Sequence, residues 1–268
     1  MYMPLTHCHP KQHLIMSFKN VVVFLDLDNT LYSYLETGFD EAMRTRIVDY
    51  FVEFLKMDRE EASALANDYH ARYGLAGNGL AKHHSTEEKT MDMVHYCRHV
   101  NSMDYARVTP NPKLSEALRM MQKEGADLWM FSNADMPHME ACIAGLDMHD
   151  VFIADTPVSE RTKYRAIDCF DQWGPSGSTD TLVNKPMRGA YETASQFAKC
   201  HPEGRAHIKV MVEDSLPNLI EPSKMGWITV WIPHGKTLPA DASVIPDITL
   251  ERVEDLPSAL LAYMKASE

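Results

Sequence analysis

The residues of this sequence that are best suited to chemistry are four acids, which come in two pairs directly after apolar runs. Asp26 and Asp28 follow the run Val-Val-Val-Phe-Leu, and Glu213 and Asp214 follow Val-Met-Val. Adjacent carboxylates repel each other unless a proton or a cation lies between them. Sites that contain several carboxylate oxygens suit Mg²⁺. The two pairs therefore indicate a divalent-cation site, provided that the fold brings them together.

Two other positions offer groups that bind anions. Ser132 and Asn133 follow the apolar stretch 127–131, and Lys185 precedes a proline and a helix-like pattern. A hydroxyl group and the first backbone N–H groups of a helix form an anion site, and a lysine can reach a phosphate as a point charge. The charge of these groups complements that of the acids.

Each of these features also has a structural explanation that involves no ligand. Aspartates after a strand favour turns, Asp214 and Ser132 can cap the helices that follow them, and a lone lysine is usually solvated. These explanations treat the positions one at a time. They do not predict that groups of complementary charge follow several strands of one sheet.

Strand-like and helix-like patterns alternate along most of the chain. Strands are expected at residues 21–25, 127–131, 151–154, 207–212 and 227–232. Helices are expected at residues 111–125, 188–199, 215–225 and 256–264. This alternation predicts an α/β fold whose parallel sheet is covered by helices on both faces. Ligands of such sheets bind beyond the carboxyl ends of the strands, where the acids and Lys185 would meet.

The block between the first two strands has an all-helical pattern instead. Apolar residues at three- and four-residue spacings predict helices at residues 39–55, 60–72 and 85–99. Ser85 and Glu88 have the form of a capping box at the start of the last helix. Gly74, Gly77 and Gly79 predict a loop between the last two helices. The block is therefore expected to be an insert in the α/β core.

Domain limits follow from these patterns. The α/β core is expected to comprise residues 17–34 and 108–268, with the helical insert at residues 35–107 and an extension at residues 1–16. The polar stretch 155–184, which contains glycine and proline, is expected to form an extended surface segment that is longer than a usual connection.

Composition excludes several classes of protein. The chain has 268 residues, of which 38 are acids and 26 are lysine or arginine, so its formal net charge is −12. Binding a nucleic-acid polymer through its phosphates requires a basic surface, so such a partner is not expected. No apolar run approaches the roughly 18 residues that cross a bilayer, and the first residues lack the apolar core of a secretory signal. We expect a soluble, cytoplasmic protein with no membrane partner.

The ordered motifs resemble those of the haloacid dehalogenase superfamily of phosphohydrolases. They are Asp26-Leu27-Asp28-Asn29-Thr30, Ser132, Lys185 and Glu213-Asp214. The resemblance implies a Rossmann-like α/β core, a small helical cap formed by residues 35–107, and Mg²⁺ as the cofactor. It also implies a small-molecule phosphate ester as the substrate.

Three less specific stretches are similar to the pyrimidine 5′-nucleotidase-like branch of that superfamily. They are residues 28–32, 69–76 and 180–186. This similarity implies hydrolysis of nucleoside 5′-monophosphates or other small phosphomonoesters. A sugar phosphate or a lysophospholipid as substrate, a phosphomutase and a phosphate-binding regulator without catalysis remain alternatives, and the sequence does not indicate the oligomeric state.

The superfamily resemblance also implies roles for the two aspartates of the first motif. Asp26 would be the nucleophile that forms an aspartyl-phosphate. Asp28 would protonate the leaving oxygen and then deprotonate the attacking water, so a raised pKa of its carboxyl group is expected.

The remaining motif residues would bind the metal and the phosphate group. The metal would be bound by Asp26, the backbone carbonyl of Asp28, Glu213 and Asp214. The phosphate oxygens would be bound by Ser132, Asn133 and Lys185. Substrate selection is assigned to cap residues near the glycine-rich stretch, namely His70, Arg72, Tyr73, Asn78 and Lys82. For Tyr73 a place in the cap core, and for Lys82 a solvated position, are the alternatives.

Overall fold

The computed structural model describes residues 17–86, 90–154, 162–172, 183–199 and 208–267. Its centre is a six-stranded sheet with the order β3-β2-β1-β4-β5-β6, and every neighbouring pair is parallel. The strands are β1 Val21–Leu25, β2 Asp127–Phe131, β3 Ala166–Ile167, β4 Ile208–Glu213, β5 Ile228–Trp231 and β6 Ile248–Thr249. The predicted parallel α/β fold is thus confirmed.

Helices cover both faces of the sheet because the buried strand β1 is apolar on both sides. Val21, Val23 and Leu25 pack in one core, and Val22 and Phe24 pack in the other. The first core includes residues of α6 Pro112–Lys123, α7 Met136–Gly145, α8 His149–Phe152 and α12 Leu256–Ala266. The second includes residues of α10 Arg188–Lys199 and α11 Pro217–Lys224. Such two-sided burial is typical of central strands in parallel sheets.

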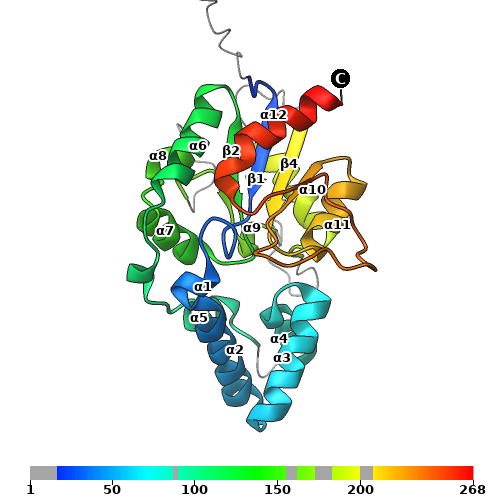
Figure 1. Ribbon diagram of the computed structural model, residues 1–268. Coiled ribbons are helices and arrows are strands. Elements are labelled where there is room, and N and C mark those ends of the chain that lie inside the picture. The colour runs from blue at the N-terminus through cyan, green and yellow to red at the C-terminus, as the bar shows by residue number, and fades with distance from the viewer. Residues whose placement is uncertain (1–16, 87–89, 155–161, 173–182, 200–207, 268) are drawn as a thin grey trace, which may run out of the picture.

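A group of four helices, here called the helical unit, follows β1 and the short helix α1 Tyr34–Thr37. Its members are α2 Phe39–Leu55, α3 Arg59–Tyr73, α4 Ala76–His84 and α5 Met93–Val100. Figure 1 shows the unit projecting from the end of the sheet at which β1 leads into α1. The unit has its own apolar cluster, which Cys169 of the core joins. This helical content agrees with the prediction for the block, whereas the proposed domain limits stay a prediction.

The glycine-rich stretch is a helix, which corrects the predicted loop. Gly74 ends α3 with a positive φ of 69°, but Gly77 and Gly79 lie inside α4. A Cβ atom on Gly77 would lie 2.5 Å from the ring of Tyr96, and one on Gly79 would lie 2.1 Å from that of Tyr69. These two glycines therefore allow close helix packing and do not break the chain.

The predicted start of the third helix is also wrong. The helix is α5, which begins at Met93 with the Asp92 side chain accepting a hydrogen bond from the backbone N–H of His95. The Ser85 hydroxyl instead accepts one from the N–H of Met91. Glu88, the other half of the expected capping box, lies outside the described residues.

The region after residue 148 differs from the prediction in two ways. The expected strand at 151–154 is the short helix α8, followed by a single antiparallel bridge from Ile153 to Tyr164. Short apolar runs fit a buried helical turn as well as a strand, and Val151 is fully buried. The described parts of the expected surface segment are 162–172, which contains β3 and α9 Cys169–Gln172 and is largely buried, and 183–184, where Asn184 is buried. The rest of that segment and the extension at 1–16 lie outside the described residues.

Within the described ranges, no helix combines the length and the apolar character that crossing a membrane requires.

Candidate active site

The acids and their partners meet at the carboxyl ends of three neighbouring strands. Asp26 follows β1 and donates its backbone N–H to Val212 of β4, with 3.0 Å between N and O. Glu213 ends β4, and Ser132 follows β2. Because parallel strands end at the same edge of a sheet, their terminal side chains share one crevice, as predicted.

Asp26, Glu213 and Asp214 form an acidic cluster whose ligand oxygens all lie within 4.8 Å of one another. Burial, reinforced by the neighbouring carboxylates, raises the pKa of Asp26 and Glu213 to about 7 and that of Asp214 to about 6. Such shifts arise where buried carboxylates lack sufficient positive charge. The donor set consists of oxygen atoms only, so it fits a hard divalent cation such as Mg²⁺.

Among the described residues, Lys185 provides the positive charge that bonds directly to this cluster. Its Nζ atom lies 2.7 Å from Oδ1 of Asp26 and 2.8 Å from Oε2 of Glu213, and the side chain is 1% exposed. Burial alone would lower the pKa of Lys185, but the two carboxylates raise it above its ordinary value. The ammonium group is therefore held in its charged form beside Asp26.

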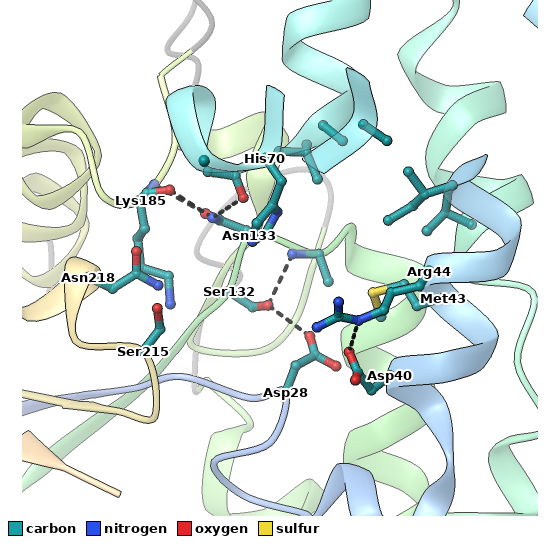
Figure 2. A pocket seen from close by; sticks show the side chains of 18 of the residues that line it. Asp28, Asp40, Met43, Arg44, His70, Ser132, Asn133, Lys185, Ser215 and Asn218 are labelled. Atoms are coloured by element: carbon teal, nitrogen blue, oxygen red, sulfur yellow. Dashed lines mark hydrogen bonds and ion pairs between the residues drawn. The ribbon is translucent and has the colours of Figure 1, made fainter. Parts of the chain in front are cut away.

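The loop that contains Lys185 is fixed by Asn133. The side-chain amide of Asn133 donates to the backbone carbonyl of Lys185 at 2.9 Å, and its carbonyl accepts from the Lys185 N–H at 3.1 Å. Figure 2 shows these two residues close together at the edge of the cavity. Asn133 was predicted to bind phosphate, but its side chain bonds to the main chain of Lys185 and so positions that residue.

Asp28 lies among three side chains with hydrogen-bonding groups. Oδ1 accepts a hydrogen bond from the Tyr32 hydroxyl and lies 2.8 Å from Nε2 of His138, and Oδ2 accepts from the Ser132 hydroxyl at 3.4 Å. Burial alone would raise the pKa of Asp28, but the charge and hydrogen bond of His138, with the bond from Tyr32, lower it. The expected raised pKa of Asp28 is therefore wrong.

His138 is a neighbour of the site that the sequence did not indicate. It lies in the first turn of α7, is fully buried, and contacts the Tyr105 hydroxyl through Nδ1 at 2.9 Å. Burial alone would lower its pKa, but the Asp28 carboxylate raises it well above the ordinary value. Only its position six residues after Ser132 could have suggested a role, because its partner Asp28 lies far away in the sequence.

A cavity of about 570 Å³ lies between the strand ends and the helical unit. Asp26, Asp28, Ser132 and Lys185 line it on the core side. On the opposite side it is lined by five residues of α2, namely Asp40, Met43, Arg44, Ile47 and Val48. These positions lie on one face of the helix because they recur at three- and four-residue spacings. The apolar spacings in residues 39–55 predicted the helix, but they did not indicate that this face lines a site.

Of the cap residues predicted to select the substrate, only His70 lines this cavity. Arg72 forms an exposed ion pair with Asp68 at 2.8 Å, and the Tyr73 hydroxyl lies 2.6 Å from Nε2 of His83. Lys82 lies over the Tyr73 ring, and the buried Asn78 bonds to Asn184. Because residues 76–84 form the helix α4, the partners of Tyr73, Asn78 and Lys82 lie outside the cavity lining.

The sequence profile of haloacid dehalogenase-like hydrolases matches residues 21–218 of this chain. The chain belongs to that family. The match includes all four motifs on which the resemblance was based and confirms the superfamily.

The individual relatives have low sequence identity to this chain. Phosphate metabolism protein 8 of Saccharomyces cerevisiae is 30% identical over 139 residues, which are 49% of this chain and 41% of that protein. CbbY from Rhodobacter sphaeroides, solved in complex with phosphate, is 18% identical with a TM-score of 0.52, covering 89% of this chain and 96% of that chain. A phosphatase from Thermococcus onnurineus is 15% identical with a TM-score of 0.51, covering 90% of this chain and 97% of that chain. At these identities the two solved structures show a shared fold.

Proposed function

We propose that this haloacid dehalogenase-like hydrolase is a Mg²⁺-dependent phosphomonoesterase that acts on a nucleoside 5′-monophosphate. The observation that supports it best is the place of Asp26, whose carboxylate belongs to the acidic cluster and is also bonded to the buried Lys185. A carboxylate in that position is held next to positive charge on one side and next to a cation site on the other. The name of the yeast relative, phosphate metabolism protein 8, and the phosphate complex of CbbY agree with this proposal.

Asp26 is the proposed nucleophile. Its Oδ1 accepts from Lys185, and its Oδ2 accepts from the Thr30 hydroxyl at 3.0 Å, so both oxygens are oriented before a substrate arrives. Attack on phosphorus would give an aspartyl-phosphate, which divides hydrolysis into two easier steps. Ser132 and Lys185 would bind the non-bridging phosphate oxygens.

Asp28 is the proposed general acid and base. The charge and hydrogen bond of His138 lower the pKa of the Asp28 carboxyl group, and a dianionic phosphate placed beside that group would shift its pKa upward. Protonation would therefore be favoured when the substrate binds. The protonated group could donate to the leaving oxygen and later accept a proton from the attacking water.

The residues that would hold Mg²⁺ are Asp26, Glu213 and Asp214, together with the backbone carbonyl of Asp28. When bound there, the ion would neutralise charge between the nucleophile and the phosphate. Asn29 orients one of these ligands, because its side-chain amide donates to Oδ2 of Asp214 at 2.7 Å. The helical unit is the proposed cap, and its α2 face would contact the leaving group.

A panel of phosphate esters tests the proposed activity. It would contain pyrimidine and purine nucleoside 5′-monophosphates, a sugar phosphate, a lysophosphatidate and p-nitrophenyl phosphate, each with Mg²⁺ and with excess chelator. We expect the highest kcat/KM for a nucleoside monophosphate and no turnover in chelator. A preference for the sugar phosphate or the lysophosphatidate would transfer the proposal to that substrate. Full activity in chelator, or hydrolysis of no ester, would contradict it.

The nucleophile assignment makes a separate prediction. Asp26→Asn should lower kcat by at least about 100-fold, because an amide is a poor nucleophile. Steady-state kinetics with Mg²⁺ would measure this. Asp241→Asn makes the same change at an exposed residue outside the cavity and should leave kcat unchanged. If Asp26→Asn keeps more than about one hundredth of the wild-type kcat, Asp26 is excluded as the nucleophile.

A further inference from the structure

The leaving-group side of the cavity contains an ion pair on α2. Nε of Arg44 lies 2.7 Å from Oδ1 of Asp40, one helical turn away, and both residues line the cavity. Figure 2 shows the pair with Met43 across the cavity from Lys185 and Ser215. The pair therefore lies where the part of a substrate that is remote from the phosphate site would extend.

His70 of α3 lies near the same pair and adds no charge at neutral pH. Desolvation by the surrounding protein, and then the positive charge of Arg44, lower the pKa of His70 below its ordinary value, although part of the residue is exposed to solvent. The group is thus a neutral imidazole, which offers one hydrogen-bond donor and one acceptor. The wall formed by Asp40, Arg44 and His70 has polar groups of both kinds but no net charge.

The other cations of the cavity lie on the acidic side. Among the described residues that line it there are five carboxylates and three cations, which are Arg44, Lys185 and Lys236. Lys185 bonds to Asp26 and Glu213, and Lys236 is close enough to Asp214 to lower the pKa of that carboxyl group. Arg44 is therefore the one cation among the described lining residues that lies on the α2 side of the cavity.

The rest of the α2 face is apolar. Met43, Ile47 and Val48 line the cavity beside the ion pair. Apolar side chains with a few polar groups are typical of sites for small organic ligands. Such a wall suits a flat, uncharged group that has an apolar face and a hydrogen-bonding edge, as a nucleobase has.

We propose that the Asp40–Arg44 pair is a specificity-determining element, which accepts an uncharged nucleoside as the leaving group and disfavours one that bears a second phosphate. The inference rests on the proposed function. Asp40 neutralises the charge that would otherwise attract a second anion, while the guanidinium keeps further N–H donors at its terminal nitrogens for a polar edge. Discrimination then results from the charge balance of the pair and not from the size of the cavity.

A comparison of two substrates that differ by one phosphate tests the inference. The kcat/KM values of a nucleoside 5′-monophosphate and of the corresponding 3′,5′-bisphosphate give a selectivity ratio. Wild type should favour the monophosphate. Asp40→Asn, which leaves the charge of Arg44 without its partner, should shift the ratio toward the bisphosphate by about two- to fivefold, the effect of one charge interaction between side chains that are 71% and 49% exposed. Arg44→Gln should shift it in the opposite direction.

The Arg59–Asp49 ion pair provides matched controls. It joins α3 to α2, is outside the cavity lining, and allows the same charge changes as Asp49→Asn and Arg59→Gln. Neither control should change the selectivity ratio. If Asp40→Asn shifts the ratio no more than Asp49→Asn does, the inference is overturned.

A binding measurement separates this inference from the proposed function. Calorimetric titration of both nucleotides into the Asp26→Asn protein with Mg²⁺, with and without Asp40→Asn, gives an affinity ratio that needs no turnover. The same shift toward the bisphosphate is expected, and its absence counts against the inference. A wild-type protein that hydrolyses neither nucleotide would refute the proposed function, while the affinity ratio would still decide the role of the pair.

Discussion

Lys185 shows how one side chain combines structural and chemical demands. It is a fully buried cation bonded to two carboxylates from different strands, and its backbone is held by Asn133. Removing one partner of a buried charged pair is costly because the other charge is left uncompensated. The same ammonium group is the proposed ligand for phosphate. Stability and activity therefore depend on this residue together.

Lys185→Met should reduce the free energy of unfolding by about 3 kcal/mol at a pH above the raised pKa values of Asp26 and Glu213. Urea denaturation in chelator would measure this. Lys224→Met removes an ammonium group whose bond to Glu221 is exposed to solvent, at 62% exposure of the lysine side chain. Lys224→Met should therefore reduce the free energy of unfolding by less than about 1 kcal/mol. Equal losses for the two variants would show that the buried interaction does not stabilise the fold.

At the scale of elements, the helical unit depends on close approach between helices. α4 packs against α3 at Gly79, where the ring of Tyr69 occupies the space that a side chain would need. The Tyr69 hydroxyl also lies 2.8 Å from Nε2 of His84 at the end of α4. The orientation of α4 determines which residues of the unit face the cavity, so this contact affects the candidate site indirectly.

Gly79→Ala tests this packing by the sign of its effect. Helix propensity alone predicts that the free energy of unfolding rises by about 1 kcal/mol. Overpacking against the Tyr69 ring predicts instead that it falls by about 2 kcal/mol. We expect the lower free energy of unfolding, which urea denaturation would measure. In a Tyr69→Ala background the ring is absent, and Gly79→Ala should be neutral or stabilising. A loss of equal size in both backgrounds would rule out the ring contact as its cause.

The whole molecule is acidic, with a net charge of −12, and the proposed substrate is an anion. Attraction must then be local, from Lys185, from helix N-termini and from a bound cation. The acidic cluster gives the metal-free protein a defined dependence on pH. Because the folded-state pKa values of Asp26 and Glu213 are raised to about 7, from 3.8 and 4.5, protonation stabilises the fold. That contribution is complete below about pH 4 and is lost as the pH rises through about 7.

Mg²⁺ should replace this lost stabilisation. We expect a rise in the midpoint of thermal unfolding on adding Mg²⁺, and a larger rise near about pH 8 than near about pH 5.5, where protons compete for the carboxylates. Asp214→Asn should reduce the rise, whereas the exposed Asp241→Asn should not. A Mg²⁺ effect that is independent of pH and of Asp214 would exclude the acidic cluster as the binding site.

Much of the core could be predicted from local patterns. Apolar runs located β1, β2, β4 and β5, and the polar residues directly after three of them identified the candidate site. Local patterns were misleading where an apolar or glycine-containing stretch fits two structures. Val151 suited a strand as well as the helical turn it forms, and Gly79 suited a loop until the ring of Tyr69 gave it a packing role.

The sequence by itself determined the family motifs and the strand ends at which they lie, because strand periodicity and the residues that follow each strand are local properties. The tertiary structure alone decided which distant residues become neighbours. His138 meets Asp28 across 110 positions, and the cavity is lined by a face of α2 that was not predicted, whereas Arg72, Tyr73, Asn78 and Lys82 do not line it. These contacts depend on how the helices pack against one another and against the sheet. The spacing of residues along the sequence does not show this packing. The ionisation of Asp28 depends on such a contact, so its pKa could be derived only from the folded chain.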